Sequence, residues 1–183
     1  MREWIPVSTS PKGRLALRAL EDFGNRAFQD VTVGELSAGA GVTTGSLYHH
    51  FESKLGLYSF VRDEAERRLL DRMEGAAAAR ADAGVAAALR GALIVGFDFA
   101  ARQGFVRLLG EPHPARDLDP VADLLAEISH SGGIPLGSVL AAAWRAALMA
   151  VAEGAAPPRA RAALELLYMD EEALARATQP STR

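Results

Sequence analysis

Residues 32–57 read TVGELSAGAGVTTGSLYHHFESKLGL and decide the fold of this chain. Thr32 is followed three residues later by Glu35, the spacing of a capping box, so we expect a helix to begin at Val33. Gly41 follows that helix and can adopt the left-handed conformation that ends a helix, because it has no Cβ to clash. The sequence therefore predicts a short helix that stops at a glycine-centred turn.

A second short helix follows this turn. Thr43 can cap a helix over residues 44–51, and Ser53 can cap a further helix that begins at residue 54. Two short helices joined by a turn of about three or four residues that contains glycine are typical of a helix-turn-helix motif. In such motifs the second helix lies in the DNA major groove.

The side chains of the second predicted helix are mostly polar. Leu47 and Phe51 are an apolar pair at i, i+4 spacing, and we expect them to point inward. The other positions carry hydroxyls, a phenol and imidazoles: Thr44, Ser46, Tyr48, His49 and His50. Such groups can bond base edges, phosphates or bridging water. A solvated helix face in an all-α protein would look the same, so this pattern alone leaves both interpretations open.

The stretch GVTTGSLYHHFESKLGL resembles the signature of the TetR (tetracycline-repressor-like) family, which runs roughly Gly-Val-Ser-x-Gly-Thr-Leu-Tyr-x-His-Phe-x-Ser-Lys-x-x-Leu. The matching positions are Gly41, Val42, Gly45, Leu47, Tyr48, His50, Phe51, Ser53, Lys54 and Leu57, with Thr43 for Ser and Ser46 for Thr. Ala27 and Ser37 depart from the family, which usually has Gly and Ala at these positions. The resemblance is confined to the first third of the chain.

The resemblance implies a head that binds double-stranded operator DNA. The residues that it places at the DNA are Thr32, Thr43, Thr44, Gly45, Ser46, Tyr48, His49, His50 and Lys54. Among them we expect Tyr48 and Lys54 to contact phosphates, and Thr44 and Ser46 to approach bases. His49 is a further candidate for the bases, and His50 for either partner.

Length and composition narrow the class of protein. At 183 residues the chain can form one large domain or a small head on a larger body. It has no apolar run long enough to span a membrane, and its first residues lack the apolar core of a signal peptide. We therefore expect a cytoplasmic protein without a membrane span. The absence of cysteine excludes disulfides and thiolate metal sites.

The charge pattern is not that of a strongly basic nucleic-acid binder, because the net charge is −3. Residues 1–57 balance six basic side chains against six acidic ones: Arg2, Lys12, Arg14, Arg18, Arg26 and Lys54 against Glu3, Glu21, Asp22, Asp30, Glu35 and Glu52. Lys12, Arg14 and Arg18 nevertheless cluster at the start of the first helix, and Lys54 begins the fourth. Since helix N-termini also favour phosphate, we expect a modest phosphate footprint there.

The remaining chain shows helical periodicity without an alternating strand pattern, so we predict an all-α fold. We divide it into a helix-turn-helix DNA-binding domain, residues 1–57, and a helical effector-binding and dimerisation domain, residues 58–183. The expected elements are a first helix opened by Ser10 and Pro11, a long helix 54–74, a break at 75–79, a helix 83–103 capped by Asp82, a short helix 105–109, a loop 110–120, and helices 120–130, 136–153 and 159–169. The long helix joins head to body and should keep Arg62, Glu66, Arg67 and Arg72 largely solvated.

The last two predicted helices, within residues 136–169, are rich in small and apolar side chains and are separated by a Pro-Pro turn. An antiparallel pair of this kind suggests packing against a second copy as a four-helix bundle, which makes a homodimer. In the TetR family these helices form the dimer interface. The alternative is that they pack only on their own body.

The family body usually binds a small molecule that changes the spacing of the two heads. The candidates for contact with an unknown effector lie on or between the middle helices: Phe97, Asp98, Arg102, Phe105, His113, Trp144 and Arg145. Asp98 and Arg145 stand within apolar helices, where a buried charge needs a partner on the protein or on a ligand. An internal ion pair or simple exposure would also explain the charges, and a plain core would explain the aromatic residues.

The chain shows no metal-ligand spacing, phosphate-binding glycine loop or nucleophile motif, so we expect no metal site, no cofactor and no enzymatic activity. The sequence favours an all-α homodimeric transcription regulator, and specifically a repressor released by a small-molecule effector. An activator or a ligand-independent DNA-binding regulator is the alternative within DNA binding. A helical small-molecule-binding protein whose head no longer reads DNA is the alternative outside it.

Overall fold

The computed structural model describes residues 9–130, 134–167 and 169–178, which form helices and contain no strand. The elements are α1 (Pro11–Asn25), the 3-10 helix η1 (Phe28–Asp30), α2 (Val33–Gly39), α3 (Thr44–Phe51), α4 (Lys54–Ala78), the 3-10 helix η2 (Ala81–Ala83), α5 (Val85–Gln103), α6 (Val106–Gly110), α7 (Pro120–Ser129), α8 (Leu136–Ala152), α9 (Pro157–Glu165) and α10 (Glu171–Thr178). The predicted all-α fold is confirmed.

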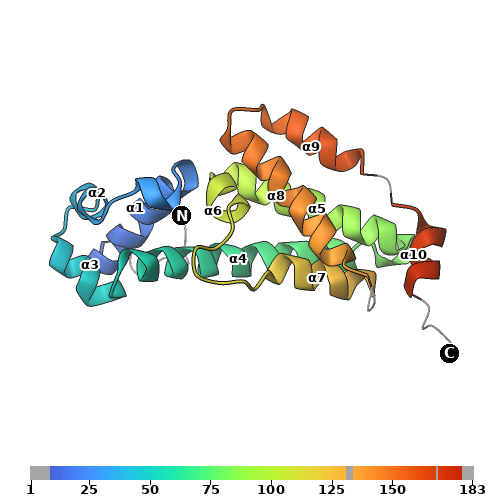
Figure 1. Cartoon of the computed structure of the whole chain (residues 1–183), viewed down its shortest axis with the longest axis horizontal. Coiled ribbons are helices and arrows are strands. Elements are labelled where there is room, and N and C mark those ends of the chain that lie inside the picture. The colour runs from blue at the N-terminus through green and yellow to red at the C-terminus, as the bar shows by residue number, and fades with distance from the viewer. Residues whose placement is uncertain (1–8, 131–133, 168, 179–183) are drawn as a thin grey trace.

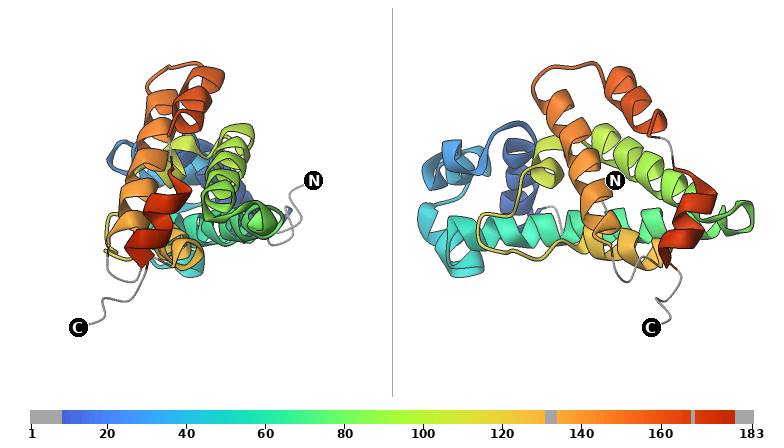
Figure 2. Two further views of the ribbon diagram at one scale, coloured as in Figure 1. Left: turned by 90° about the vertical axis from the view of Figure 1, so that its right-hand side faces the viewer. Right: turned by 45° about the vertical axis from the view of Figure 1, so that its right-hand side comes forward.

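The helices make an elongated molecule with a small head at one end and a larger body at the other (Figure 1). α1, α2 and α3 form the head, and α4 starts there and runs along the body. Its 25 residues correspond to a rod about 37 Å long. The end-on view in Figure 2 shows the body helices gathered as a bundle. A single helix therefore belongs to both parts of the molecule.

The predicted helix caps in the head are confirmed. Ser10 accepts a hydrogen bond from the backbone N–H of Gly13, with Pro11 in the first turn of α1. Thr43 and Ser53 cap α3 and α4 in the same way, each accepting from the backbone N–H three residues later. Each side chain satisfies one of the amide donors that a helix start leaves without a partner.

The boundary between α4 and α5 differs from the prediction. α4 continues through Gly75 to Ala78 instead of breaking, because the alanines after Gly75 are strong helix formers. Asp82 does not cap α5 but lies within η2, and α5 starts at Val85 after Gly84, whose φ is +99°. The cap comes from far along the chain, because the N–H of Ala86 donates to Glu171 Oε2 at 2.7 Å.

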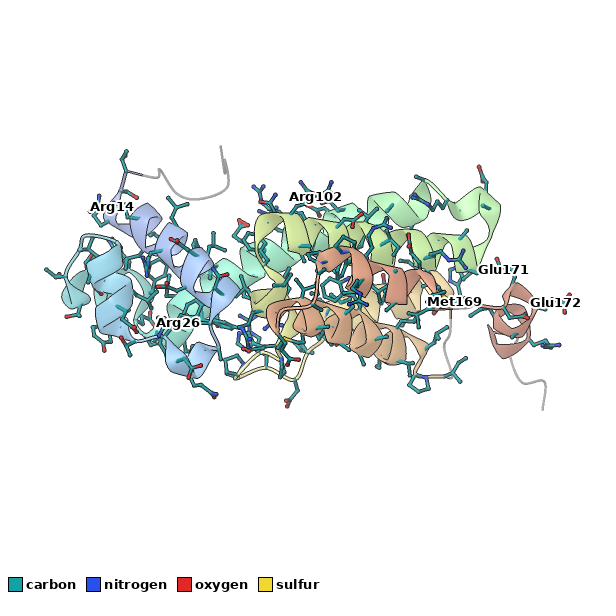
Figure 3. The ribbon with its side chains drawn as sticks, turned by 90° about the horizontal axis from the view of Figure 1, so that it is seen from above. Arg14, Arg26, Arg102, Met169, Glu171 and Glu172 are labelled. Carbon is teal, nitrogen blue, oxygen red and sulfur yellow. The ribbon has the colours of Figure 1, made fainter. Side chains whose placement is uncertain are left out.

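The C-terminal helices also depart from expectation. α9 spans Pro157–Glu165 and ends four residues before the predicted 169, while α10 is an additional helix that the sequence pattern does not predict. Asp170 Oδ1 accepts from the N–H of Ala173 at 2.8 Å, a cap that the sequence Asp-Glu-Glu could have suggested. Figure 3 shows Met169, Glu171 and Glu172 at the end of the molecule opposite Arg14. The break predicted near residues 131–133 lies outside the described residues.

Head and body meet where α1 packs against α4 and α6, and two contacts there are especially close. The rings of Phe23 and Phe28 in the head each lie 5.0 Å, centroid to centroid, from the ring of Tyr58 on α4. Gly24 of α1 lies directly against Gly104, which follows α5. The approach is so close that a Cβ on Gly24 would stand 2.2 Å from the Gly104 carbonyl oxygen. The absence of a side chain at Gly24 thus allows two backbone segments to touch.

Candidate nucleic-acid interface

The structure orients α3 as the pattern predicts. Leu47 is fully buried and Phe51 is 7% exposed, so this pair anchors the helix in the core of the head. The opposite side presents Thr44, Tyr48 and His49 to solvent, and the Tyr48 side chain is 53% exposed. A large exposed aromatic residue beside small hydroxyls is unusual for a helix whose role is only packing. This face can reach base edges and phosphates.

The remaining polar side chains of α3 are arranged around that face. Gly45 is exposed, whereas Ser46 and His50 are half-buried at its margin. The imidazole rings of His49 and His50 lie 5.0 Å apart, centroid to centroid. Both rings can therefore present nitrogen atoms to the same region of a bound molecule.

The turn before α3 fixes the angle between the two helices of the motif. Gly41 has φ of +63°, as the sequence predicts, and the N–H of Val42 donates to the carbonyl of Ser37 at 3.0 Å. An L side chain at position 41 would be strained in this conformation. The backbone of the turn thus determines where α3 projects from the head.

Thr32, at the start of α2, is part of the confirmed capping box. Its Oγ1 accepts from the N–H of Glu35 at 3.2 Å and donates to Glu35 Oε2 at 2.7 Å. Hydrogen bonds from the Thr32 side chain and backbone, with the ion pair to Arg26, lower the pKa of Glu35 to about 2. Thr32 and Thr43 both remain exposed, so capping and a contact to DNA are compatible.

The half-buried Lys54, a predicted phosphate contact, is also bonded within the protein. Its Nζ donates to the carbonyl oxygens of Phe28 and Val31, at 2.9 and 2.8 Å, and lies 4.2 Å from the centroid of the Phe28 ring. Two of the three ammonium donors are thereby used within the protein. Lys54 thus fastens the start of α4 to the segment that precedes α2, and its contact with a phosphate stays a prediction for the remaining donor.

The basic residues at the start of α1 are also engaged inside the head. Arg14 Nε donates to the carbonyl of Ala40 at 2.9 Å, which satisfies an acceptor at the end of α2. Arg18 forms a two-point ion pair with Asp22, at 2.7 and 2.8 Å. The Lys12 ammonium lies 5.0 Å from the centroid of the Phe60 ring. The phosphate footprint expected from these residues is therefore smaller than their number suggests.

Residues 18–59 match the family model described as bacterial regulatory proteins, tetR family. Over these residues the chain is similar to that family. The match runs from the middle of α1 through α2 and α3 into the first turns of α4, so the matched segment contains the whole exposed face of α3. No curated protein matches the chain.

The candidate effector residues of the body are not gathered in one place. Phe97, Asp98 and Arg102 line one side of a groove of about 300 Å³, which Pro157, Pro158 and Arg161 line from α9. Within it Arg161 Nε donates to Asp98 Oδ1 at 2.9 Å. Asp98 therefore has a partner on the protein, which was the alternative that the sequence left open.

The other candidates lie elsewhere in the body. Arg145 forms a two-point ion pair with Asp119; burial raises the pKa of Asp119, but hydrogen bonds, foremost the one from Arg145, bring it below its usual value. Phe105 is 1% exposed and Trp144 is fully buried, as expected of core residues. The indole Nε1 of Trp144 nevertheless has no hydrogen-bond acceptor among the described residues. His113 lies near the head, in the segment after α6.

A metal-binding cluster and a membrane-spanning helix are both absent from the part of the chain that the structure describes. Over residues 9–130, 134–167 and 169–178, no cluster of three His, Asp or Glu side chains could hold a metal ion. In the same ranges, no helix is long and apolar enough to cross a membrane.

Proposed function

We propose that the protein is a sequence-specific transcriptional repressor that binds operator DNA as a homodimer and is released by a small-molecule effector. The exposed face of α3 carries this proposal, because Thr44, Tyr48 and His49 project from a helix held rigidly by Leu47 and Phe51. A DNA-binding regulator acts where the chromosome lies, so we expect the protein in the cytoplasm. Regulation of this kind requires no chemical reaction, so we expect no enzymatic activity.

DNA from beside the protein's own gene tests the first part of this proposal. Binding should be measured by fluorescence anisotropy at several salt concentrations, with a scrambled duplex of the same length as control. Replacing Thr44 by Val removes the hydroxyl at constant shape and should weaken operator binding by about 1–3 kcal/mol, with a smaller effect on scrambled DNA. Equal weakening on both duplexes would mean that Thr44 does not read sequence.

Homodimerisation is proposed through the outward faces of α8 and α9, within the predicted segment 136–169. Leu140, Leu148 and Leu164 are buried against their own body, so part of the apolar pattern serves the monomer core. Val139 and Leu166, by contrast, are 59% and 82% exposed in the single chain. Val139 lies on α8 and Leu166 directly follows α9, and large exposed apolar side chains of this kind are typical of a surface that a second copy covers.

A matched pair of variants tests this surface by analytical ultracentrifugation. Val139→Asp should convert the dimer to a monomer, because it places a charge in the proposed interface. Leu118→Asp is the control, since Leu118 is 78% exposed but lies in the loop before α7. A wild-type monomer at micromolar concentration, or equal dissociation of both variants, would contradict the proposed interface.

Effector release is proposed on two observations in the body. The groove that contains Phe97, Asp98 and Arg102 is open to solvent along α9, and the buried Trp144 indole offers a donor that an acceptor-bearing ligand can use. Linkage gives the test: operator DNA must weaken effector binding by the same factor by which effector weakens DNA binding. A compound that binds free and DNA-bound protein equally well would favour the ligand-independent or activator alternatives.

A further inference from the structure

Residues 111–116, here called the strap, are fastened to α4 close to the head. Arg62 of α4 is only 2% exposed, although its sequence position predicts a solvated side chain. Its Nη1 donates to the carbonyl of Glu111 and to the hydroxyl of Tyr58, both at 2.8 Å, and its Nε donates to Glu66 Oε1 at 2.8 Å. A buried guanidinium with this many partners holds the start of the strap against α4.

A second fastening lies at the other end of the strap. Arg116 forms a two-point ion pair with Asp63 of α4, with distances of 2.6 and 2.9 Å. This pair is exposed, so it contributes less to holding the strap than the buried Arg62 does. Between the two fastenings lies His113, whose ring centroid is 5.5 Å from that of Tyr58.

The hydrogen bonds of His113 define its protonation state in the closed strap. Its Nδ1 accepts from the backbone N–H of Ala115 at 3.1 Å, so Nδ1 carries no proton. Its Nε2 lies 3.1 Å from Ser59 Oγ on α4 and in this tautomer donates to it. The neutral imidazole thus joins the strap to α4, whereas a protonated imidazole would place two N–H groups against each other at Ala115.

The charges around His113 also disfavour its protonated form. The titratable groups that face it from α4 and from the strap are Tyr58, Arg62, Asp63, Glu66 and Arg116. Both carboxylates are already paired with the two arginines. Burial, and then Arg116 and Arg62, lower the pKa of His113 below its usual value, against the smaller effects of Glu66 and Asp63.

We propose that His113 is a proton-sensitive latch, closed in its neutral form, which couples pH to the position of the DNA-binding head through the strap and α4. Protonation breaks the bond from Ala115 and adds a third cation beside Arg62 and Arg116. The strap then loosens where Tyr58 packs on Phe23 and Phe28 of the head. The sign follows from the lowered pKa of His113: the closed strap keeps its full stability above about pH 6.5, the pKa of a free histidine, and loses it as the pH falls from there through the lower pKa of the folded protein.

The first test needs no DNA and is an NMR titration of the full chain between pH 7.5 and 5.5. At pH 7.5 the His113 ring should be the neutral tautomer protonated at Nε2, and on acidification the amide signals of residues 111–116 should broaden or shift with the ring. His113→Gln should abolish this response, since its amide can accept from Ala115 and donate to Ser59 at every pH. A ring that is already protonated at pH 7.5, or strap signals that ignore its titration, would overturn the latch.

The second test measures DNA affinity over the same pH range and rests on the proposed function. Wild type should lose about three- to tenfold more affinity than His113→Gln on acidification, since a single proton is coupled. His49 and His50 are present in both proteins, so the comparison isolates the effect of His113. His130→Asn is the control, because His130 is exposed, lies away from the strap and has φ of +52°, which Asn tolerates.

The two tests separate the possible failures. If the NMR response is present but no DNA is bound at any pH, the proposed function is wrong and the latch stands. If DNA is bound but wild type and His113→Gln respond to pH in parallel, the coupling to the head is refuted. Loss of folding in His113→Gln would appear in its NMR spectrum at pH 7.5, and the wild-type ring titration would then decide alone.

Discussion

Gly24→Ala is the sharpest test of how the head is set against the body. The new Cβ would stand 2.2 Å from the carbonyl oxygen of Gly104 and 3.4 Å from its carbon. Real Cβ atoms essentially never come within 3.0 Å of such an atom, and both partners here are backbone, which has no rotamer to change. The two segments must therefore separate by roughly 1 Å, and such overpacking costs about 1–3 kcal/mol.

Part of that cost is offset, because alanine within a helix is about 0.5–1 kcal/mol more favourable than glycine. We expect a net loss of about 1–2 kcal/mol, which lowers the melting temperature of a chain of this size by roughly 2–8 °C. Gly75→Ala is the matched control: it lies inside α4, a Cβ there would meet nothing within 4 Å, and it should raise stability. Calorimetry and urea unfolding of both variants decide the matter. A Gly24→Ala protein as stable as wild type would refute the close contact.

Three further outcomes follow from single residues. Lys54→Met removes both hydrogen bonds to the carbonyls of Phe28 and Val31, so the free energy of unfolding should fall by about 1–3 kcal/mol. The salt dependence of DNA binding should change little, and a drop of one unit in the salt slope would show instead that Lys54 contacts a phosphate. Ser37→Ala should raise stability by about 1 kcal/mol in urea unfolding, because the buried Ser37 hydroxyl has no partner among the described residues. Glu35 has a pKa of about 2, so its contribution to the free energy of unfolding is complete above about pH 4.5 and is lost between pH 4.5 and 2. Glu35→Gln should therefore flatten the dependence of stability on pH in that window, as measured by urea unfolding.

The parts of the fold that follow from the sequence are those determined by neighbouring residues. Each predicted cap in the head joins a side chain to a backbone amide three residues away, so the relevant geometry is contained in one helical turn. The left-handed Gly41 and the inward pair Leu47 and Phe51 are of the same kind. These local features also define the candidate DNA interface, so the residue pattern alone is enough to predict which face of α3 is exposed.

The parts that the sequence pattern does not predict depend on residues far apart in the chain. Glu171 caps α5 from 85 residues away, and Lys54 reaches back to carbonyls 23 and 26 residues earlier. A solvated Arg62 is the natural expectation, because a charged residue on a long helix is usually exposed. Its burial depends on a loop carbonyl 49 residues later, which no local pattern reports. The strap is unpredictable for the same reason.

These long-range contacts restrict how a signal from the body can reach α3. α4 is unbroken from Lys54 to Ala78, so its two ends move together unless the helix bends. Beside α4, the head meets the body through α1, which packs against α6 and touches Gly104 at Gly24, and the strap lies next to Tyr58 on α4. An effector that leaves all of these contacts unchanged leaves the recognition helix where it was, however tightly it binds, because only a difference in free energy between two arrangements moves the equilibrium. Variants at His113 and Gly24 should therefore change the coupling between effector and DNA, in contrast to Gly75→Ala, which alters α4 without touching either contact.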